Sequence, residues 1–271
     1  AGERARVGAA RALASGSAGV SRLQEILAHK RFEVDRLGPA PASSFVPRPL
    51  ALRRSAPGPL HLICEIKRRS PSAGQLSTAL GVGQRARLYE HGGASMVSVL
   101  TDAKYFDGAF AHLSEARAAT SIPVLCKDFV IDQVQLDWAR ALGADAVLLI
   151  ARCLDQEQLA RLLGAARTRG LTPLVEVATE AEADQACALG ADLIGVNARD
   201  LDSLRMDQDR ARRIVAGLSP EVTRVHLSGV KSADDVRVLA AAGLDAALIG
   251  EALMRRDDPS ELLDQLRAAA G

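Results

Sequence analysis

Eight short apolar segments, separated by stretches with helical periodicity, are the feature that most constrains the fold of this 271-residue chain. The apolar segments span residues 60–67, 96–100, 123–129, 146–151, 172–177, 193–197, 223–227 and 246–249. Between them, stretches such as 133–142, 156–169, 180–189 and 233–242 repeat apolar residues at the spacing of an amphipathic helix. Alternation of strand and helix is typical of parallel sheets. Eight units without a break predict a closed (β/α)8 TIM barrel in preference to an open doubly wound sheet.

A repeated turn supports this prediction. Glycine, then a small or apolar residue, then Ser or Asp, precedes every second strand, starting at Gly93, Gly143, Gly190 and Gly243. Each glycine stands where a helix must end in a left-handed cap. The turns recur about every two strand–helix units, as expected for an internally repetitive architecture.

The region before the first strand has a different character. Residues 21–37 place Leu23, Ile26, Leu27 and Val34 on one helical stripe after a candidate cap at Ser21, whereas residues 38–59 contain six prolines. So many prolines exclude a regular element. We therefore predict a flexible or loosely helical N-terminus over 1–20, an N-terminal helical extension with a proline-containing arm over 21–59, and one barrel domain over 60–271.

Composition excludes several classes of function. Lys plus Arg total 34 and Asp plus Glu total 33, so the net charge of +1 argues against a nucleic-acid or membrane-surface partner. The longest apolar runs are strand-sized and much shorter than the roughly 20 residues of a membrane helix. Four widely spaced cysteines without a Cys-x-x-Cys motif indicate neither a metal site nor a disulfide framework. We expect a cytoplasmic protein with reduced thiols and no metal.

Polar and glycine residues gather where the predicted strands end. They are Glu65, Lys67, Lys127, Glu176, Asn197, Arg199, Ser228, Gly229, Gly250 and Glu251. The loops at the carboxyl ends of barrel strands meet on one face, so a functional site is expected there. Alternation along a strand places Glu65 and Lys67 on the same, inward face.

The residue types suggest three kinds of role, each with a simpler structural alternative. Lys127 and Glu176 can serve as general acid and general base, or form a structural salt bridge. The glycines after the seventh and eighth strands stand where barrels commonly bind phosphate, or they form tight turns. Phe106, in the loop after the second strand, can wall a flat apolar substrate or anchor its loop by packing.

Six motifs, in order along the chain, carry a resemblance to a known family. They are CEIKRRSPS at 64–72, SVLTD at 98–102 with YFDG at 105–108, PVLCKDF at 123–129, LVEV at 174–177, GVNARDL at 195–201 and LIGEALM at 248–254. Together they resemble indole-3-glycerol phosphate synthase, a barrel of the tryptophan pathway, from about residue 23 to the end of the chain.

The resemblance implies a substrate, a reaction and a role for each site residue. The substrate would be 1-(o-carboxyphenylamino)-1-deoxyribulose 5-phosphate, and the products indole-3-glycerol phosphate, carbon dioxide and water, with no cofactor. Lys127 would be the general acid and Glu176 the carboxylate that assists proton removal, while Lys67 would bind the anthranilate carboxylate or share the acid–base work. The remaining roles are orientation by Glu65 and Asn197, positive charge from Arg199, an apolar ring pocket at Phe106, and contacts to the phosphate end from Ser70, Ser228, Gly229, Gly250 and Glu251.

One position departs from the family pattern. The family usually has Glu-Ser-Gly after the seventh strand, but this chain has Leu227-Ser228-Gly229. Loss of a carboxylate near two lysines lowers their pKa values. This departure keeps two alternatives open: a related sugar-phosphate enzyme similar to phosphoribosylanthranilate isomerase, and a degenerate barrel that only binds a phosphorylated ligand. We expect a monomer, with association with other tryptophan-pathway enzymes left open.

Overall fold

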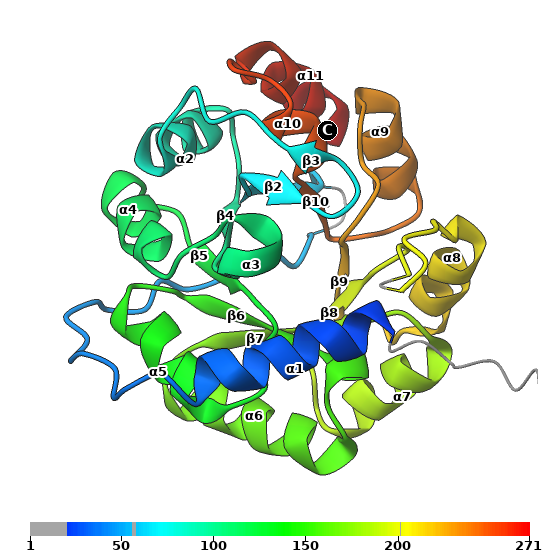
Figure 1. Cartoon of the computed structure of the whole chain (residues 1–271). Coiled ribbons are helices and arrows are strands. Elements are labelled where there is room, and N and C mark those ends of the chain that lie inside the picture. Colours follow the sequence, from blue (N-terminus) through cyan, green and yellow to red (C-terminus); the bar gives the residue numbers. More distant parts are fainter. Residues whose placement is uncertain (1–20, 56–57, 201) are drawn as a thin grey trace, which may run out of the picture.

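The computed structural model describes residues 21–55, 58–200 and 202–271, so the predicted N-terminus over 1–20 lies outside the described residues. Eight parallel strands form a closed barrel in the order β1-β10-β9-β8-β7-β6-β5-β4 (Figure 1). Their bounds are β1 His61–Ile66, β4 Met96–Leu100, β5 Val124–Lys127, β6 Ala146–Ile150, β7 Thr172–Val177, β8 Leu193–Val196, β9 Thr223–His226 and β10 Ala246–Ile249. All eight predicted strands are confirmed. The pairing of β1 with both β4 and β10 closes the barrel.

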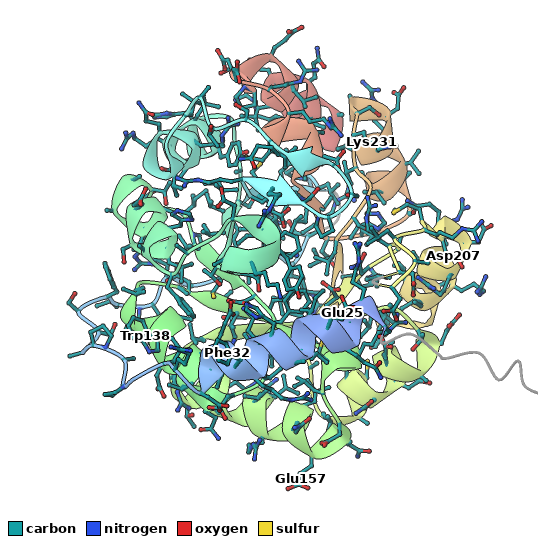
Figure 2. All side chains as sticks on the ribbon, in the orientation of Figure 1. Glu25, Phe32, Trp138, Glu157, Asp207 and Lys231 are labelled. Carbon is teal, nitrogen blue, oxygen red and sulfur yellow. The ribbon has the colours of Figure 1, made fainter. Side chains whose placement is uncertain are left out.

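Helices surround the barrel and alternate with its strands. The longer ones are α2 Val82–His91, α4 Ala111–Ala119, α5 Gln133–Ala141, α6 Gln156–Thr168, α7 Glu180–Ala188, α8 Gln208–Gly217, α9 Ala233–Ala241 and α11 Ser260–Ala270. Charged side chains such as Glu157 project outward from this ring (Figure 2). The repeated turns have positive φ angles of 88° at Gly93, 92° at Gly143, 76° at Gly190 and 76° at Gly243, which confirms the predicted left-handed caps.

Shorter elements lie above the barrel, where the strands end. They are α3 Ala103–Phe106, the 3-10 helix η1 Ala151–Cys153, α10 Glu251–Met254, and a small antiparallel hairpin of β2 Arg69–Ser70 and β3 Gly74–Gln75. The hairpin follows β1 directly and lies over the barrel mouth in Figure 1. It carries one of the predicted site residues, Ser70.

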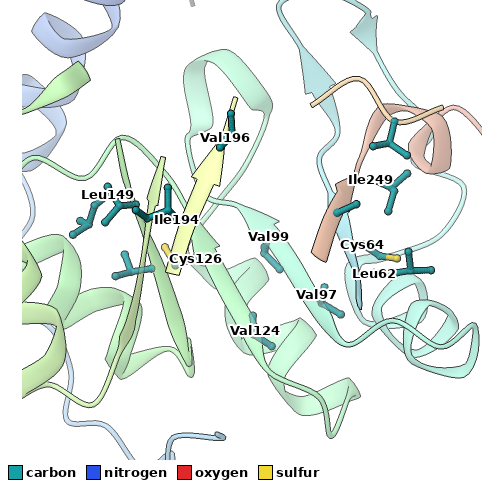
Figure 3. Packing of buried hydrophobic residues seen from close by; sticks show 14 of the residues in the cluster. Leu62, Cys64, Val97, Val99, Val124, Cys126, Leu149, Ile194, Val196 and Ile249 are labelled. Carbon is teal, nitrogen blue, oxygen red and sulfur yellow. The ribbon is translucent and has the colours of Figure 1, made fainter. Parts of the chain in front are cut away.

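Alternation along the strands creates two separate apolar layers. Leu62, Cys64 and Ile66 of β1 face outward into the layer between strands and helices (Figure 3). Ile63 faces inward, and so does Glu65, two residues later. The inward direction predicted for Glu65 is therefore correct.

The N-terminal extension spans the barrel from one end to the other. α1, Arg22–Val34, has a capping box at Ser21 and lies in front of β6 and β7 in Figure 1. Its Leu23 and Ile26 belong to the apolar cluster of the barrel interior. The arm then reaches the opposite end, where the backbone N–H of Arg48 donates to Asp145 ahead of β6 (2.6 Å). At that end Leu52 is buried in the same interior cluster, so the extension covers the mouth and the arm closes the base.

Two absences concern the described residues only. No helix within 21–55, 58–200 and 202–271 is long and apolar enough to cross a membrane. In the same part of the chain, no group of three or more His, Cys, Asp or Glu side chains is placed to hold a metal ion.

Candidate active site

A cavity of about 700 Å³ opens at the carboxyl ends of the strands. Eleven of the twelve predicted site residues line it: Glu65, Lys67, Ser70, Phe106, Lys127, Asn197, Arg199, Ser228, Gly229, Gly250 and Glu251. Glu176 is the exception and lies outside the lining. The predicted set therefore converges in space from β1, β5, β8, β9, β10 and the loops after them.

Two lysines share one buried carboxylate. Nζ of Lys67 lies 2.6 Å from Oε1 of Glu65, and Nζ of Lys127 lies 3.7 Å from Oε2. Glu65 is only 2% exposed. Burial alone would raise the pKa of Glu65, but the two ammonium groups outweigh it and lower that pKa. Glu65 is thus ionised, and it pairs closely with the Lys67 ammonium and more distantly with the Lys127 ammonium.

Glu176 has the opposite electrostatic environment. It is 4% exposed, and its Oε1 accepts a hydrogen bond from Nδ2 of Asn197 (2.8 Å). Burial raises the pKa of Glu176 in spite of Lys127 and Asn197, which act in the other direction. Two carboxylates on one rim therefore differ in their readiness to take a proton, the arrangement by which acid and base roles are separated.

Asn197 connects Glu176 to the cavity wall. Its side-chain oxygen accepts the backbone N–H of Arg199 (2.9 Å), which fixes the amide so that its Nδ2 points to Glu176. Asn197 lines the cavity and Glu176 does not. Glu176 thus lies just beyond the wall, a position that alternation along its strand could not reveal.

Leu227 occupies the place where the family pattern has a carboxylate. It is 5% exposed and lines the cavity. A Cβ built on Gly195 would lie 2.8 Å from Cγ of Leu227, so the leucine fills the space above that glycine. Gly195 pairs in register with Glu176. Leu227 therefore packs over the residue of β8 that is the register partner of Glu176.

The charge of the lining is strongly positive. Its basic residues are Arg22, Lys67, Lys127, Arg199, Lys231, Arg255 and Arg256, whereas its acidic residues are Glu65 and Glu251. A chain with a net charge of only +1 therefore concentrates cations at this cavity. Such a surface favours an anionic ligand.

The glycine-rich side of the cavity leaves room for backbone approach. Gly229 has a φ of +87° and Gly250 lies against the Glu65–Lys67 pair, where a Cβ would be 2.9 Å from Nζ of Lys67. The hydroxyl of Ser228 is buried and has no hydrogen-bond partner among the described residues. A ligand oxygen at this end could supply that partner.

Aromatic rings form another wall. Phe106 of α3 and Phe129, two residues after Lys127, have ring centroids 6.3 Å apart. The sequence prediction included Phe106 and missed Phe129. Its even spacing from the inward-facing Lys127 was the available signal.

Other lining residues were also missed. Arg22 and Ile26 come from α1, and Lys231, Arg255 and Arg256 come from loops whose sequence has no distinctive pattern. Their participation depends on how the extension and loops fold over the barrel, which short-range spacing does not encode.

Comparison with known proteins gives a consistent family. The sequence model described as "Indole-3-glycerol phosphate synthase" matches residues 12–266. A protein named indole-3-glycerol phosphate synthase from Mycobacterium ulcerans (strain Agy99) is 45% identical over 232 residues, covering 84% of each chain. One of the same name from Exiguobacterium sp. is 42% identical over 251 residues, covering 93% of this chain and 98% of the relative.

Solved structures of other proteins resemble this chain in fold. A 3-hexulose-6-phosphate synthase has a TM-score of 0.62 at 18% identity, covering 78% of this chain and all of that one. Thiamine phosphate pyrophosphorylase from Pyrococcus furiosus has a TM-score of 0.60 at 20% identity, with coverage of 78% and 95%. These similarities support the barrel architecture.

Proposed function

The chain belongs to the indole-3-glycerol phosphate synthase family, and we propose that it closes the indole ring of 1-(o-carboxyphenylamino)-1-deoxyribulose 5-phosphate in tryptophan biosynthesis. The products are indole-3-glycerol phosphate, carbon dioxide and water. One observation carries the proposal: two ammonium groups share the Glu65 carboxylate in the wall of a cationic cavity, and Glu176, a carboxylate of opposite pKa shift, lies just beyond that wall. The substrate carries a carboxylate and a phosphate, which suits that charge.

Lys127 is the general acid for ring closure. The ring carbon that bears the substrate carboxylate attacks the ketone carbon, and the Lys127 ammonium protonates the ketone oxygen to a hydroxyl. Of the two lysines on Glu65, Lys127 is the more loosely held, at 3.7 Å against 2.6 Å for Lys67. A loosely paired ammonium loses less on donating its proton, so we assign the donor role to Lys127.

Decarboxylation and dehydration complete the reaction. When carbon dioxide leaves, the electrons of the broken carbon–carbon bond return to the ring and restore its aromaticity. The hydroxyl then departs as water after a second protonation by Lys127, which regains its protons from solvent. Glu176 takes the proton released as the new double bond forms, a role suited to a carboxylate whose pKa is raised above its ordinary value by burial.

The remaining lining residues bind and orient the substrate. Lys67, held by Glu65, takes the anthranilate carboxylate, and Arg199 adds positive charge. The rings of Phe106 and Phe129 enclose the aromatic part of the substrate. The phosphate lies against Ser70, Ser228, Gly229, Gly250 and Glu251, where the Ser228 hydroxyl, which has no partner among the described residues, is available to it.

The site keeps its acid and base residues although Leu227 replaces a carboxylate of the family pattern. Glu176 and Asn197 supply a base with a fixed orientation, and Glu65 supplies the ionised partner for both lysines. The missing carboxylate leaves the cavity more positive, which favours an anionic substrate. A barrel that only binds its ligand is the second candidate, because Leu227 replaces a side chain of the family's site.

The proposal also includes a cellular compartment and an oligomeric state. We place the reaction in the cytoplasm, since all four cysteines are free and so fit a reducing compartment. We expect the chain to act as a monomer. Size-exclusion chromatography at the assay concentration tests this, and a dimer would contradict it.

Steady-state turnover tests the function. Purified protein is mixed with the carboxyphenylamino-deoxyribulose phosphate, and product is followed by indole fluorescence. We expect saturable turnover in the wild type and a large loss in Lys127→Ala. Folded wild-type protein, verified by circular dichroism, that makes no product would contradict the proposed activity.

A further inference from the structure

A lysine of the covering helix is buried among carboxylates beside the active site. Lys30 of α1 is 3% exposed. Its Nζ lies 2.7 Å from Oδ2 of Asp102, 2.8 Å from Oδ1 of Asp128 and 2.6 Å from Oε2 of Glu33. Asp102 follows β4 and Asp128 follows β5, so a single ammonium links α1 to two neighbouring strand ends.

This burial needs a reason. Removing an ammonium and two carboxylates from water costs several kcal/mol per ion, and good geometry must offset that cost. Burial by itself would lower the pKa of Lys30, yet Asp128 and Asp102 raise it above its ordinary value. Lys30 is therefore a permanent cation, and the cluster exists only while α1 lies in its place over the barrel.

Each aspartate also holds a part of the active site. Oδ1 of Asp102 accepts the backbone N–H of Tyr105 (2.7 Å) and so caps α3, the short helix that ends in Phe106. The other aspartate, Asp128, follows Lys127 directly, and its Oδ1 accepts the backbone N–H of Phe129 (2.7 Å). Its Oδ2 accepts the hydroxyl of Thr101 (2.6 Å), which ties the ends of β4 and β5 together.

We propose that Lys30 is a positioning residue, whose ammonium fixes the acid Lys127 and the Phe106–Phe129 wall relative to each other. The three elements that meet at this ammonium carry three parts of the cavity: Ile26 on α1, Phe106 on α3, and Lys127 at the end of β5 with Phe129 just after it. The expected loss of kcat without Lys30 rests on the proposed function. The expected displacement of Lys127, Phe106 and Phe129 does not. A misplacement of about 1 Å in such a site costs roughly 100-fold in rate.

The chain contains a matched control at the other end of the barrel. Arg117 of α4 is 7% exposed and pairs with the buried Asp145 at 2.6 Å. It also donates to the carbonyl of Val46 in the arm (2.5 Å), so this buried cation too fastens the N-terminal extension to the barrel. Arg117 lies ahead of the strands, away from the cavity lining. A purely structural Lys30 should behave like Arg117.

Kinetics of Lys30→Met and Arg117→Met separate the two roles. Both variants are assayed below their measured unfolding temperatures. We expect kcat to fall roughly 10- to 100-fold in Lys30→Met and to stay within about twofold of wild type in Arg117→Met, although both lose thermal stability. Equal kcat losses in the two variants, or wild-type kcat in Lys30→Met, would overturn the inference.

A second variant covers failure of Lys30→Met to fold. Lys30→Arg keeps the positive charge but spreads it over a planar group that cannot repeat the geometry of the ammonium. We expect a folded protein whose kcat falls at least about fivefold, on the same positional argument. Wild-type kcat in folded Lys30→Arg would show that charge alone suffices and would overturn the positioning role.

A crystal structure of the folded Lys30 variant gives a readout that does not depend on the reaction. In the unchanged protein the Phe106 and Phe129 centroids are 6.3 Å apart and Lys127 Nζ lies 3.7 Å from Glu65 Oε2. We expect at least one of these separations to change by about 1 Å. Unchanged separations would overturn the inference even if the wild type turned over. Altered separations in a protein without turnover would instead count against the proposed function alone.

Discussion

Replacing Gly250 with alanine should displace the Glu65–Lys67 pair, because the added methyl group would lie too close to both side chains. Gly250 has a φ of −120°, so a left-handed backbone is not the reason for glycine here. A Cβ at this position would lie 2.9 Å from Nζ of Lys67 and 3.1 Å from Cδ of Glu65. Non-bonded heavy atoms of this kind prefer separations of roughly 3.5 Å or more. The Glu65–Lys67 pair must therefore move away from its observed position.

The size of the effect can be worked from that displacement. The Lys67–Glu65 hydrogen bond is 2.6 Å long and charge-assisted, and such bonds contribute about 1.5–3 kcal/mol. Its loss corresponds to roughly a 10- to 100-fold decrease in kcat/KM. Because Glu65 also anchors Lys127, we expect kcat itself to fall. If Gly250 served the phosphate alone, KM would rise and kcat would stay unchanged.

Steady-state kinetics of Gly250→Ala test this reasoning against a control glycine. Gly164 lies inside α6 with open space around its Cβ position, so Gly164→Ala should leave kcat unchanged and stabilise the helix by up to about 1 kcal/mol. A Gly250→Ala enzyme with kcat and kcat/KM within twofold of wild type would refute the steric argument.

Three further predictions concern the acid, the base and the departure from the family pattern. Lys127→Ala should lower kcat/KM by about 10²–10⁴-fold without changing the circular dichroism spectrum, and a smaller kinetic loss would place the acid on Lys67. Glu176 has a raised folded-state pKa, so its contribution to stability is fully present below about pH 4.5 and is lost as pH rises through that higher pKa. Glu176→Gln should therefore raise the unfolding temperature at pH 8. The same variant should lower kcat and remove the acid limb of the pH–rate profile. An unfolding temperature equal to that of wild type would contradict the cost of burying the ionised Glu176 carboxylate. Leu227→Glu should lower stability by about 1–3 kcal/mol in denaturant titration, because a carboxylate replaces a packed apolar side chain. A free energy of unfolding equal to that of wild type would contradict the packing of Leu227.

Local spacing was sufficient to predict the strands and helices. Apolar runs, helical periodicity and the repeated glycine turns specify local structure, and eight such units leave few alternatives to a barrel. The closing contact between β1 and β10 joins residues far apart in the chain, such as Cys64 and Ile249, and no local signal specifies it. The path of the arm from the mouth to the base of the barrel was equally hidden, because proline content only excludes regular structure.

The site was predictable as far as strand ends determine it. Lys67 and Lys127 were found because parity and the barrel geometry place them on one rim. Lys30 was missed although it continues the stripe of Leu23, Ile26 and Leu27 at helical spacing, because a lysine on a surface helix ordinarily extends into water. Only the packing of α1 onto Asp102 and Asp128 shows its place in the site.

The product balance of the wild-type protein is the most direct test of the proposed ring-closing activity. Indole-3-glycerol phosphate and carbon dioxide are quantified together as the carboxyphenylamino-deoxyribulose phosphate is consumed. We predict equal amounts of both products, formed with Leu227 in place. Tight binding of the substrate without either product, with both products restored by Leu227→Glu, would contradict it and would identify the chain as a binding barrel.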